Sequence, residues 1–340
     1  MNFGLMMTFQ NPARWARPFP ELYRVTIEHA ARAEELGFGE IWLTEHHFDV
    51  DGWSPSPMTL AAGVATRTER IRIGTFITIL PFQNPVRLAE DIVTADILSN
   101  GRLDVGLGKG YRVNEYRSFG IPREERAAIF EENLEVLQRM LSGERFSFEG
   151  KYNHLTDIQL SPLPVQRPFP PLWLGARGKK AVQRAARLGY NLMGAGDAAT
   201  LAYDHALEQA NRRPRDFSVA QLRWVYVAET RDRAWDEAGE HLHFLFANAF
   251  PMLKEAGDLA ADRAMREPPS LAELRKVDPM SPGGFPIIGT ADDCTRAIDN
   301  YLKTTRVTHL AMGMHLPGLA PDKALRSMEL FAREVMPHFN

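Results

Sequence analysis

The sequence lacks most features that mark secreted, membrane-bound or nucleic-acid-binding proteins. Its 340 residues include one cysteine, Cys294, which excludes an intramolecular disulfide and a cysteine-based zinc cluster. No apolar run is long enough to cross a bilayer, and the amino terminus has neither the basic region nor the apolar region of a signal peptide. The formal net charge of −3 gives no sign of a surface that binds polyanions. We therefore expect a cytoplasmic protein without nucleic-acid or membrane partners.

Short apolar runs alternate with longer amphipathic runs along most of the chain. This alternation predicts parallel strands joined by crossover helices. Eight such units in one domain, 1–340, predict a (β/α)8 TIM barrel in preference to a doubly wound sheet. The eight strand candidates are Phe3–Met7, Glu40–Thr44, Ile71–Leu80, Arg102–Leu107, Leu172–Leu174, Tyr190–Met193, Val219–Ala228 and Thr308–Met314.

Helix candidates follow or separate these strands, and two segments break the alternation. Phe146–Gln159 has the pattern of a β-hairpin excursion. The segment 251–286 is rich in proline and poor in periodicity, so we expect either disorder or a mobile lid inserted before the last unit. The helix candidates are Pro20–Leu36, Ser56–Thr68, Pro85–Ser99, Arg123–Leu141, Lys179–Leu188, Ala198–Arg212, Asp232–Phe250, Thr290–Lys303 and Pro321–Met336.

The second strand candidate runs directly into Glu45, His46 and His47. In barrels of this kind the loops after the strands build the site, so these residues are candidates for acid–base chemistry. Neighbouring side chains on an extended strand face opposite sides, so at most one imidazole should face the barrel mouth. A structural corner remains an equal alternative. A metal site is disfavoured, because two adjacent histidines chelate poorly.

Two glycine-containing turns carry cations and could bind phosphate. One is Gly106-Leu-Gly108-Lys109-Gly110, and the other is Gly175-Ala176-Arg177-Gly178-Lys179 ahead of a helix. The second places backbone N–H groups, a positive helix end and three flanking cations together, counting Lys180. Glycine turns and solvated lysines are common, however, so each cation is equally consistent with plain surface exposure.

Several ordered motifs resemble the bacterial luciferase-like flavin-dependent monooxygenases, most closely the luciferase alpha subunit and its single-chain relatives. The resemblance implies a barrel that binds reduced FMN at the carboxyl ends of its strands. There the flavin captures dioxygen as a C4a-hydroperoxide and oxygenates a small organic substrate, which apolar residues such as Trp53 predict to be hydrophobic. The motifs are Thr44–Phe48, Ile71–Pro81, Asn84–Asp91, Gly101–Leu103 and Tyr116–Gly120.

The resemblance also implies roles for individual residues. His46 matches the family's catalytic imidazole, and Glu45 matches a carboxylate near the flavin. The family places a non-proline cis peptide in the stretch beneath the isoalloxazine, and segment 251–286 falls where luciferase has its lid. The remaining cofactor-binding matches are Thr75, Phe76 and Ile77 beneath the ring, and Lys109, Arg177, Gly178 and Lys179 at the phosphate.

The resemblance leaves alternatives open. Gly108 stands where the luciferase alpha subunit has a reactive cysteine, so efficient light emission is not expected. A deazaflavin- or FMN-dependent hydride-transfer oxidoreductase and a non-catalytic flavin-binding partner subunit would use the same barrel. No nicotinamide fingerprint opens a helix after a strand, so reduced flavin would come from a separate reductase. By family analogy we expect a homodimer or a higher homo-oligomer.

Overall fold

A closed parallel barrel forms the centre of the molecule, as the sequence predicts. The computed structural model describes residues 1–176, 178–194, 197–256, 267–278 and 286–339. Neighbouring barrel strands are parallel throughout. The pairing of β9 with β10 closes the ring. The barrel strands are β1 (Asn2–Met7), β2 (Glu40–Leu43), β3 (Arg72–Thr75), β5 (Leu103–Gly108), β8 (Leu172–Gly175), β9 (Asn191–Met193), β10 (Val219–Val227) and β12 (His309–Gly313).

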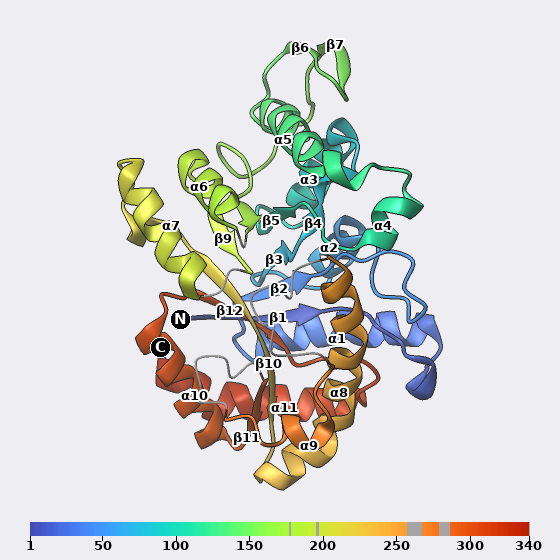
Figure 1. Ribbon diagram of the computed structural model, residues 1–340, viewed down its shortest axis with the longest axis vertical. Coiled ribbons are helices and arrows are strands. Elements are labelled where there is room, and N and C mark those ends of the chain that lie inside the picture. The colour runs from blue at the N-terminus through green and yellow to red at the C-terminus, as the bar shows by residue number, and fades with distance from the viewer. Residues whose placement is uncertain (177, 195–196, 257–266, 279–285, 340) are drawn as a thin grey trace.

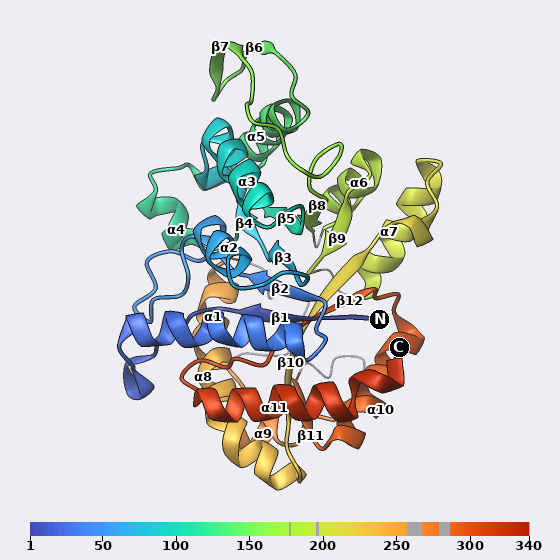
Figure 2. The ribbon, with the colours of Figure 1, turned by 180° about the vertical axis from the view of Figure 1, so that it is seen from behind.

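Helices surround the barrel (Figure 1), and two of them begin at a side-chain cap. Asn84 accepts backbone N–H bonds at the start of one helix, with proline in the next position, and Thr290 forms a capping box with Asp293 at another. Figure 2 shows α1 and α11 lying alongside each other on one side of the barrel. The main helices are α1 (Phe19–Glu35), α2 (Pro57–Ala65), α3 (Pro85–Leu98), α5 (Arg126–Leu141), α6 (Lys179–Leu188), α7 (Asp197–Gln209), α8 (Arg231–Ala256), α10 (Ala291–Thr304) and α11 (Pro321–Glu334).

Tryptophans fill the barrel interior, and glycines on the strands next to β2 make room for Trp42. Trp42 and Trp173 are buried with ring centroids 5.4 Å apart in an edge arrangement. A Cβ placed on Gly74 would lie 2.2 Å from a ring carbon of Trp42, and one on Gly4 would lie 2.6 Å from its indole nitrogen. The barrel interior is therefore a packed core and not a ligand channel.

The predicted strand Ile71–Leu80 is in fact two strands. The chain pairs with its neighbours as β3 and again as β4 (Thr78–Ile79), and the peptide between Phe76 and Ile77 lies in the gap and is cis. No proline or glycine in the gap signals this break. Thr75 maintains the contact with β5, because its hydroxyl donates to the Gly106 carbonyl at 2.8 Å and accepts the Gly106 N–H at 2.9 Å.

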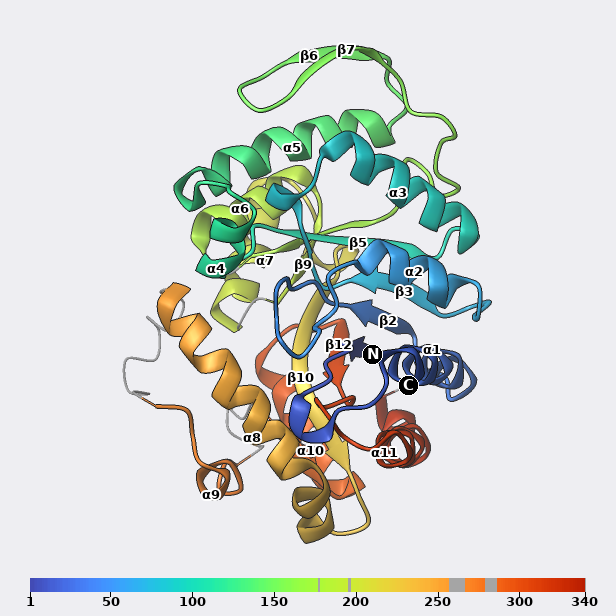
Figure 3. The same ribbon diagram turned by 90° about the vertical axis from the view of Figure 1, so that its right-hand side faces the viewer.

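The predicted excursion is also present. β6 (Phe146–Glu149) and β7 (His154–Ile158) form an antiparallel hairpin that extends beyond α5, away from the barrel (Figure 3). Arg145 and Asp157 join its two ends through a salt bridge of 2.6 Å. The hairpin lies at the far side of α5 and contributes nothing to the barrel mouth.

Segment 251–286 contains structure that the sequence pattern did not predict. α8 continues through Pro251 instead of ending at Phe250, and β11 (Pro286–Gly289) pairs with the carboxyl half of β10. The short helix α9 (Leu271–Leu274) packs on α8, with Leu274 buried. The rest of the expected lid, 257–266 and 279–285, lies outside the described residues. Among the helices of the described ranges, none is long and apolar enough to span a membrane.

Candidate active site at the carboxyl end of the barrel

The two adjacent histidines after β2 bind different carboxylates. Nδ1 of His46 lies 2.9 Å from Oε1 of Glu115, whereas Nε2 of His47 lies 2.8 Å from Oε1 of Glu45. Both imidazoles are largely buried, with 12% of each side chain exposed. The two rings thus contact different carboxylates on different sides of the loop.

Glu115 comes from α4 (Val113–Ser118), a short helix after β5 that the sequence pattern did not predict. Its side chain is fully buried, and Oε1 also accepts the backbone N–H of His47 at 2.9 Å. Burial alone would raise the pKa of this carboxyl, but the hydrogen bond to His46 and the nearby Arg112 lower it below its ordinary value. Glu115 is therefore an anion at neutral pH, and it holds a proton on His46 Nδ1.

An arginine and a tryptophan enclose the His46 imidazole. Arg112 is buried and donates to Asp49 at 2.5 Å, with its guanidinium carbon 5.1 Å from the centre of the Trp53 ring. Trp53 meets His46 edge-on at 4.5 Å, and its indole N–H donates to Thr44 Oγ1 at 2.7 Å. These contacts fix the ring orientation and limit the access of water to it.

The electrostatics of His46 favour a neutral imidazole. Burial lowers its pKa below the ordinary value, and Arg112 adds to this effect, while Glu115 and Asp49 oppose it. With the proton on Nδ1 facing Glu115, Nε2 is a free lone pair. That nitrogen has no hydrogen-bond partner among the described residues, so it is available to a reacting group.

Glu45 connects the loop after β2 to the chain after the β3–β4 break. Its carboxylate accepts the Ile79 N–H at 3.1 Å and the Gln83 side-chain amide at 3.2 Å, in addition to His47. Burial raises the pKa of this carboxyl, and the bond to His47 counteracts the rise. All of these contacts lie within the protein, so Glu45 positions its neighbours.

The segment at the β3–β4 break forms an apolar surface at the barrel mouth. Ile77 lies over two glycines of adjacent strands, since a Cβ on Gly108 would be 1.9 Å from its Cδ1 and a Cβ on Gly175 would be 3.1 Å from its Cγ2. Phe76 meets Trp42 edge-on at 5.8 Å and is only partly buried. A planar ring system could lie on this surface with little polar contact beneath it.

Positive charge gathers next to this surface. Lys109 follows β5 directly, and burial together with the neighbouring Arg184 and Arg126 lowers the pKa of its ammonium group. Arg126 begins α5, and Arg184 lies on α6, where it pairs with Glu131. Cations that repel one another in a partly buried place are suited to a bound polyanion such as a phosphate monoester.

The start of α6 lies on the neighbouring loop, because β5 and β8 are paired and α6 follows β8. Gly178 caps this helix without a side-chain bond, and a Cβ on it would meet no atom within 4 Å. Lys179 is exposed. Arg177 lies outside the described residues. The open cap of α6 and Lys109 thus follow two neighbouring strands at the same end of the barrel.

These residues fit reduced FMN, the cofactor that the family resemblance implies. The ring would lie on the Phe76–Ile77 surface, and Lys109, Arg126 and Arg184 would hold the phosphate. No cluster of three or more histidine, cysteine or acidic side chains suited to a metal ion occurs in the part of the chain that the structure describes.

Sequence reasoning missed several residues of the site that come from distant parts of the chain. Glu115, Arg126 and Arg184 were not singled out, although Glu115 directly precedes the Tyr116–Gly120 motif that carries part of the resemblance. Their partners are far away in sequence: Glu115 follows His46 by 69 residues. Only the fold reveals that these residues meet.

Comparison with known proteins gives a match over most of the chain. The family model described as luciferase-like monooxygenase matches residues 1–309. An uncharacterized protein of Sinorhizobium fredii is 38% identical over 169 residues, which make up 50% of this chain and 48% of that protein. Limonene 1,2-monooxygenase of Rhodococcus erythropolis is 27% identical, with 92% of this chain and 80% of that protein covered. F420-dependent glucose-6-phosphate dehydrogenase of Amycolatopsis mediterranei is 26% identical, with 92% and 94% covered.

Solved structures share the fold over their whole length. The monooxygenase RslO1 of Streptomyces bottropensis has a TM-score of 0.85 and 26% identity, with 100% of both chains covered. The oxygenating constituent of 3,6-diketocamphane monooxygenase of Pseudomonas putida, solved with FMN, has a TM-score of 0.83 and 22% identity, with 99% of this chain and 98% of that chain covered. At this identity the second likeness concerns the fold alone.

Proposed function

The chain belongs to the luciferase-like monooxygenase family, and on this premise we propose that it is a flavin-dependent monooxygenase. It would use reduced FMN and dioxygen to oxygenate a small, hydrophobic organic substrate. His46 would be the residue that transfers the proton. Light emission is not part of this proposal, since Gly108 replaces the cysteine of the luciferase alpha subunit.

The observation that carries this proposal is the bond between His46 and Glu115. A buried anion 2.9 Å from Nδ1 fixes the tautomer, so that Nε2 is the base. When Nε2 takes a proton, Glu115 stabilises the resulting imidazolium without moving. The same pair can return the proton later, which a reaction that consumes and releases protons requires.

When bound, reduced FMN supplies two electrons that allow one oxygen atom of dioxygen to enter the substrate and the other to leave as water. Lys109, Arg126 and Arg184 would anchor its phosphate, with the start of α6 at Gly178 and Lys179 beside them. Phe76 and Ile77 would support the ring, and Thr75 holds their segment against β5 through Gly106.

Other residues would keep water and stray protons away from His46. Trp53 and Tyr111 both meet its ring edge-on, at 4.5 and 5.7 Å. Glu45 would act through His47 and the chain after the β3–β4 break and not by direct proton transfer, because its oxygens are bound within the protein. Exclusion of water from a reactive oxygen species prevents its unproductive loss.

The partners follow from the chemistry. The sequence has no nicotinamide fingerprint, so a separate reductase would deliver reduced FMN by diffusion. A homodimer or higher homo-oligomer remains a proposal from family analogy, and so does the lid role of segment 251–286.

One alternative has a specific observation in its favour. A relative that is 26% identical to this chain is F420-dependent, and the basic turn Gly178-Lys179 could accept a more highly charged cofactor. A deazaflavin enzyme would transfer hydride and need no dioxygen. A non-catalytic flavin-binding subunit is the remaining alternative, but the positioned His46 argues against it.

Anaerobic titration separates the cofactors. Binding would be measured by fluorescence or calorimetry. We expect reduced FMN to bind at least tenfold more tightly than reduced F420. Preferential binding of F420 would refute the FMN assignment. Bound FMN with product formed only after a second homologous chain is added would support the subunit alternative instead.

A further inference from the structure

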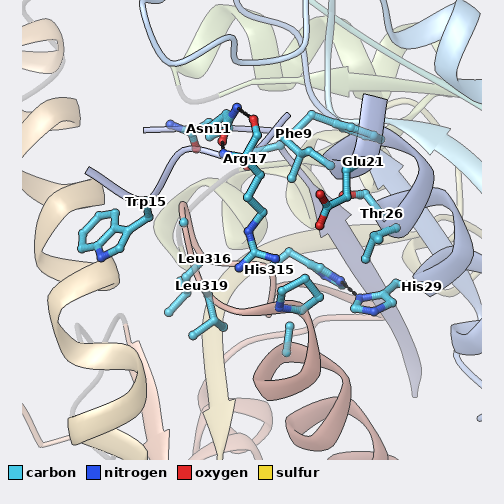
Figure 4. Close-up of a pocket in the computed structure, with 17 residues that line it drawn as sticks. Phe9, Asn11, Trp15, Arg17, Glu21, Thr26, His29, His315, Leu316 and Leu319 are labelled. Carbon is cyan, nitrogen blue, oxygen red and sulfur yellow. Dashed lines mark hydrogen bonds between the residues drawn. The ribbon is translucent and has the colours of Figure 1, made fainter. Parts of the chain in front are cut away.

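A pocket lies between α1, the chain that follows β1 and the loop that leads from β12 into α11 (Figure 4). One wall of the pocket is the segment Thr8–Asn11, which directly follows β1. Another wall is the face of α1 that carries residues between Glu21 and His29. None of the residues proposed to bind flavin lines it. The site is therefore separate from the candidate active site, although Gln10 of its wall bonds to Asp51 in the loop after β2 at 2.8 Å.

Arg17 is the one cation that lines this pocket. The side chain of Asn11 fixes the backbone of Arg17 through two hydrogen bonds. Its Nδ2 donates to the Arg17 carbonyl at 2.8 Å, and its Oδ1 accepts a hydrogen bond from the Arg17 backbone N–H at 2.9 Å. The side chain extends into the pocket (Figure 4) and is half-buried. It forms no ion pair with any residue in the described ranges, not even with Glu21 at the pocket rim.

Two further side chains in the wall each have one buried polar atom that lacks a partner in the described part of the chain. Oε1 of Gln10 and Nδ1 of His315 have no hydrogen bond within the described part of the chain. Gln10 is 6% exposed. Nε2 of His315 lies 2.8 Å from Nδ1 of His29, so one nitrogen of His315 is committed and the other is not. A buried polar atom without a partner costs free energy, which a bound ligand would recover.

The His29–His315 pair is neutral. Burial lowers the pKa of both rings, and His29 lowers that of His315 further, to about 3, whereas Glu28 opposes the lowering at His29. If His29 donates from Nδ1 to His315, then the proton of His315 is on Nδ1, which makes that atom a hydrogen-bond donor. A donor beside an arginine favours an anionic ligand.

The remaining wall is apolar. Phe9, Leu316 and Leu319 are buried and present hydrocarbon to the cavity, with Leu22 and Val25 of α1 beside them. Such a wall suits a short alkyl or ring group and not a free inorganic ion.

We propose that this pocket binds a small organic acid. Its carboxylate would pair with the Arg17 guanidinium and accept a hydrogen bond from His315 Nδ1, and its hydrocarbon part would lie on Phe9, Leu316 and Leu319. Gln10 Oε1 would accept a hydrogen bond from a hydroxyl or a bound water. The site takes its ligand independently of flavin.

Hexanoate is a suitable probe, with hexanamide as the uncharged control of the same length. We expect calorimetry to show hexanoate binding at least tenfold more tightly than hexanamide, since a charge-assisted hydrogen bond corresponds to a factor of about ten or more. Arg17→Gln should abolish this preference, and Arg17→Lys should restore part of it. The His315 imidazole resonances should shift with hexanoate in the wild type and not in Arg17→Gln.

Matched variants locate the binding. Arg24→Gln removes an exposed α1 cation that pairs with Glu28 outside the pocket, and it should bind hexanoate like the wild type. Lys109→Gln and saturating FMN should also leave hexanoate binding unchanged. The proposal is wrong if hexanoate does not bind, if hexanamide binds equally well, or if Arg17→Gln retains the preference. It is also wrong if FMN displaces the probe, because the probe would then occupy the barrel mouth.

Discussion

Oε1 of Glu115 bonds to both histidines of the loop after β2, to Nδ1 of His46 and to the backbone N–H of His47, each at 2.9 Å. One oxygen of a buried carboxylate thus sets both the path of this loop and the tautomer of its first imidazole. Residues that orient a catalytic imidazole commonly affect activity almost as strongly as the imidazole itself.

Replacing Glu115 should change the pH dependence of the reaction. Glu115 raises the pKa of His46, and burial lowers it by more, so the neutral base persists below pH 6.5. In Glu115→Gln the negative charge that raises the pKa of His46 is gone. The acid limb of the kcat/KM profile should therefore move to lower pH. The maximal rate should fall by about 10- to 100-fold, because Gln fixes the tautomer less well. A purely structural role would lower the rate without moving the acid limb.

The phosphate role of Lys109 can be separated from general binding. Lys109→Gln should weaken the binding of FMN by about tenfold or more, because one charge-assisted contact to the phosphate is lost. Riboflavin has the same ring but no phosphate, and its affinity should change less than about twofold. Lys303→Gln, on an exposed helix face where Lys303 pairs with Asp299, is the matched control and should bind both like the wild type. Equal losses for FMN and riboflavin would contradict the assignment.

Much of the fold follows from local sequence. Helix Lys179–Leu188 has the bounds that its amphipathic pattern and the following Gly189 predict, because the glycine adopts the left-handed conformation that ends a helix. The hairpin around Gly150 and the eight barrel strands also follow from patterns that a window of about ten residues contains.

The features that escaped prediction depend on distant contacts. The run Ile71–Leu80 is rich in β-branched residues on both sides of the break, so nothing local marks the break that Thr75 bridges through Gly106. β11 is short and lies in a proline-rich stretch, and it exists because β10 extends beyond the barrel and offers an edge. Proline usually ends a helix, yet α8 continues through Pro251. In the site, the position of Glu45 and His46 after the second strand could be predicted from the sequence. The hydrogen bond between His46 and Glu115 could not.

The packing of Trp42 makes Gly74 intolerant of any side chain. A Cβ there would lie 2.2 Å from a carbon of a ring that is fully buried and cannot rotate away. Gly74→Ala should reduce the free energy of unfolding by about 1–3 kcal/mol or more, measured by denaturant unfolding. In contrast, Gly63→Ala places its methyl 3.5 Å from Ile27 in an open part of α2, and it should be neutral or stabilising by about 0.5–1 kcal/mol. Equal effects of the two variants would contradict this account of the barrel core.

The ion pair behind the histidine loop should be sensitive to loss of one partner. Asp49→Asn removes the closer of the two carboxylates beside the buried Arg112 guanidinium and leaves Glu115 at 3.9 Å, so we expect a loss of about 1–3 kcal/mol in the free energy of unfolding. The exposed pair of Arg213 and Asp216 is the comparison, and Asp216→Asn should cost less than about 1 kcal/mol. If Asp49→Asn is as stable as the wild type, the prediction is wrong, and the ion pair of Asp49 with Arg112 does not stabilise the fold.

The origin of the oxygen atom in the product tests the central claim most directly. The purified protein would be mixed with photochemically reduced FMN, a panel of terpenes, ketones and aldehydes, and ¹⁸O2, and the products analysed by mass spectrometry. We predict one ¹⁸O atom per product molecule with the wild type, and a yield lower by about 10²- to 10⁴-fold with His46→Ala. Oxidised product without ¹⁸O, or an unchanged yield in His46→Ala, would contradict the account.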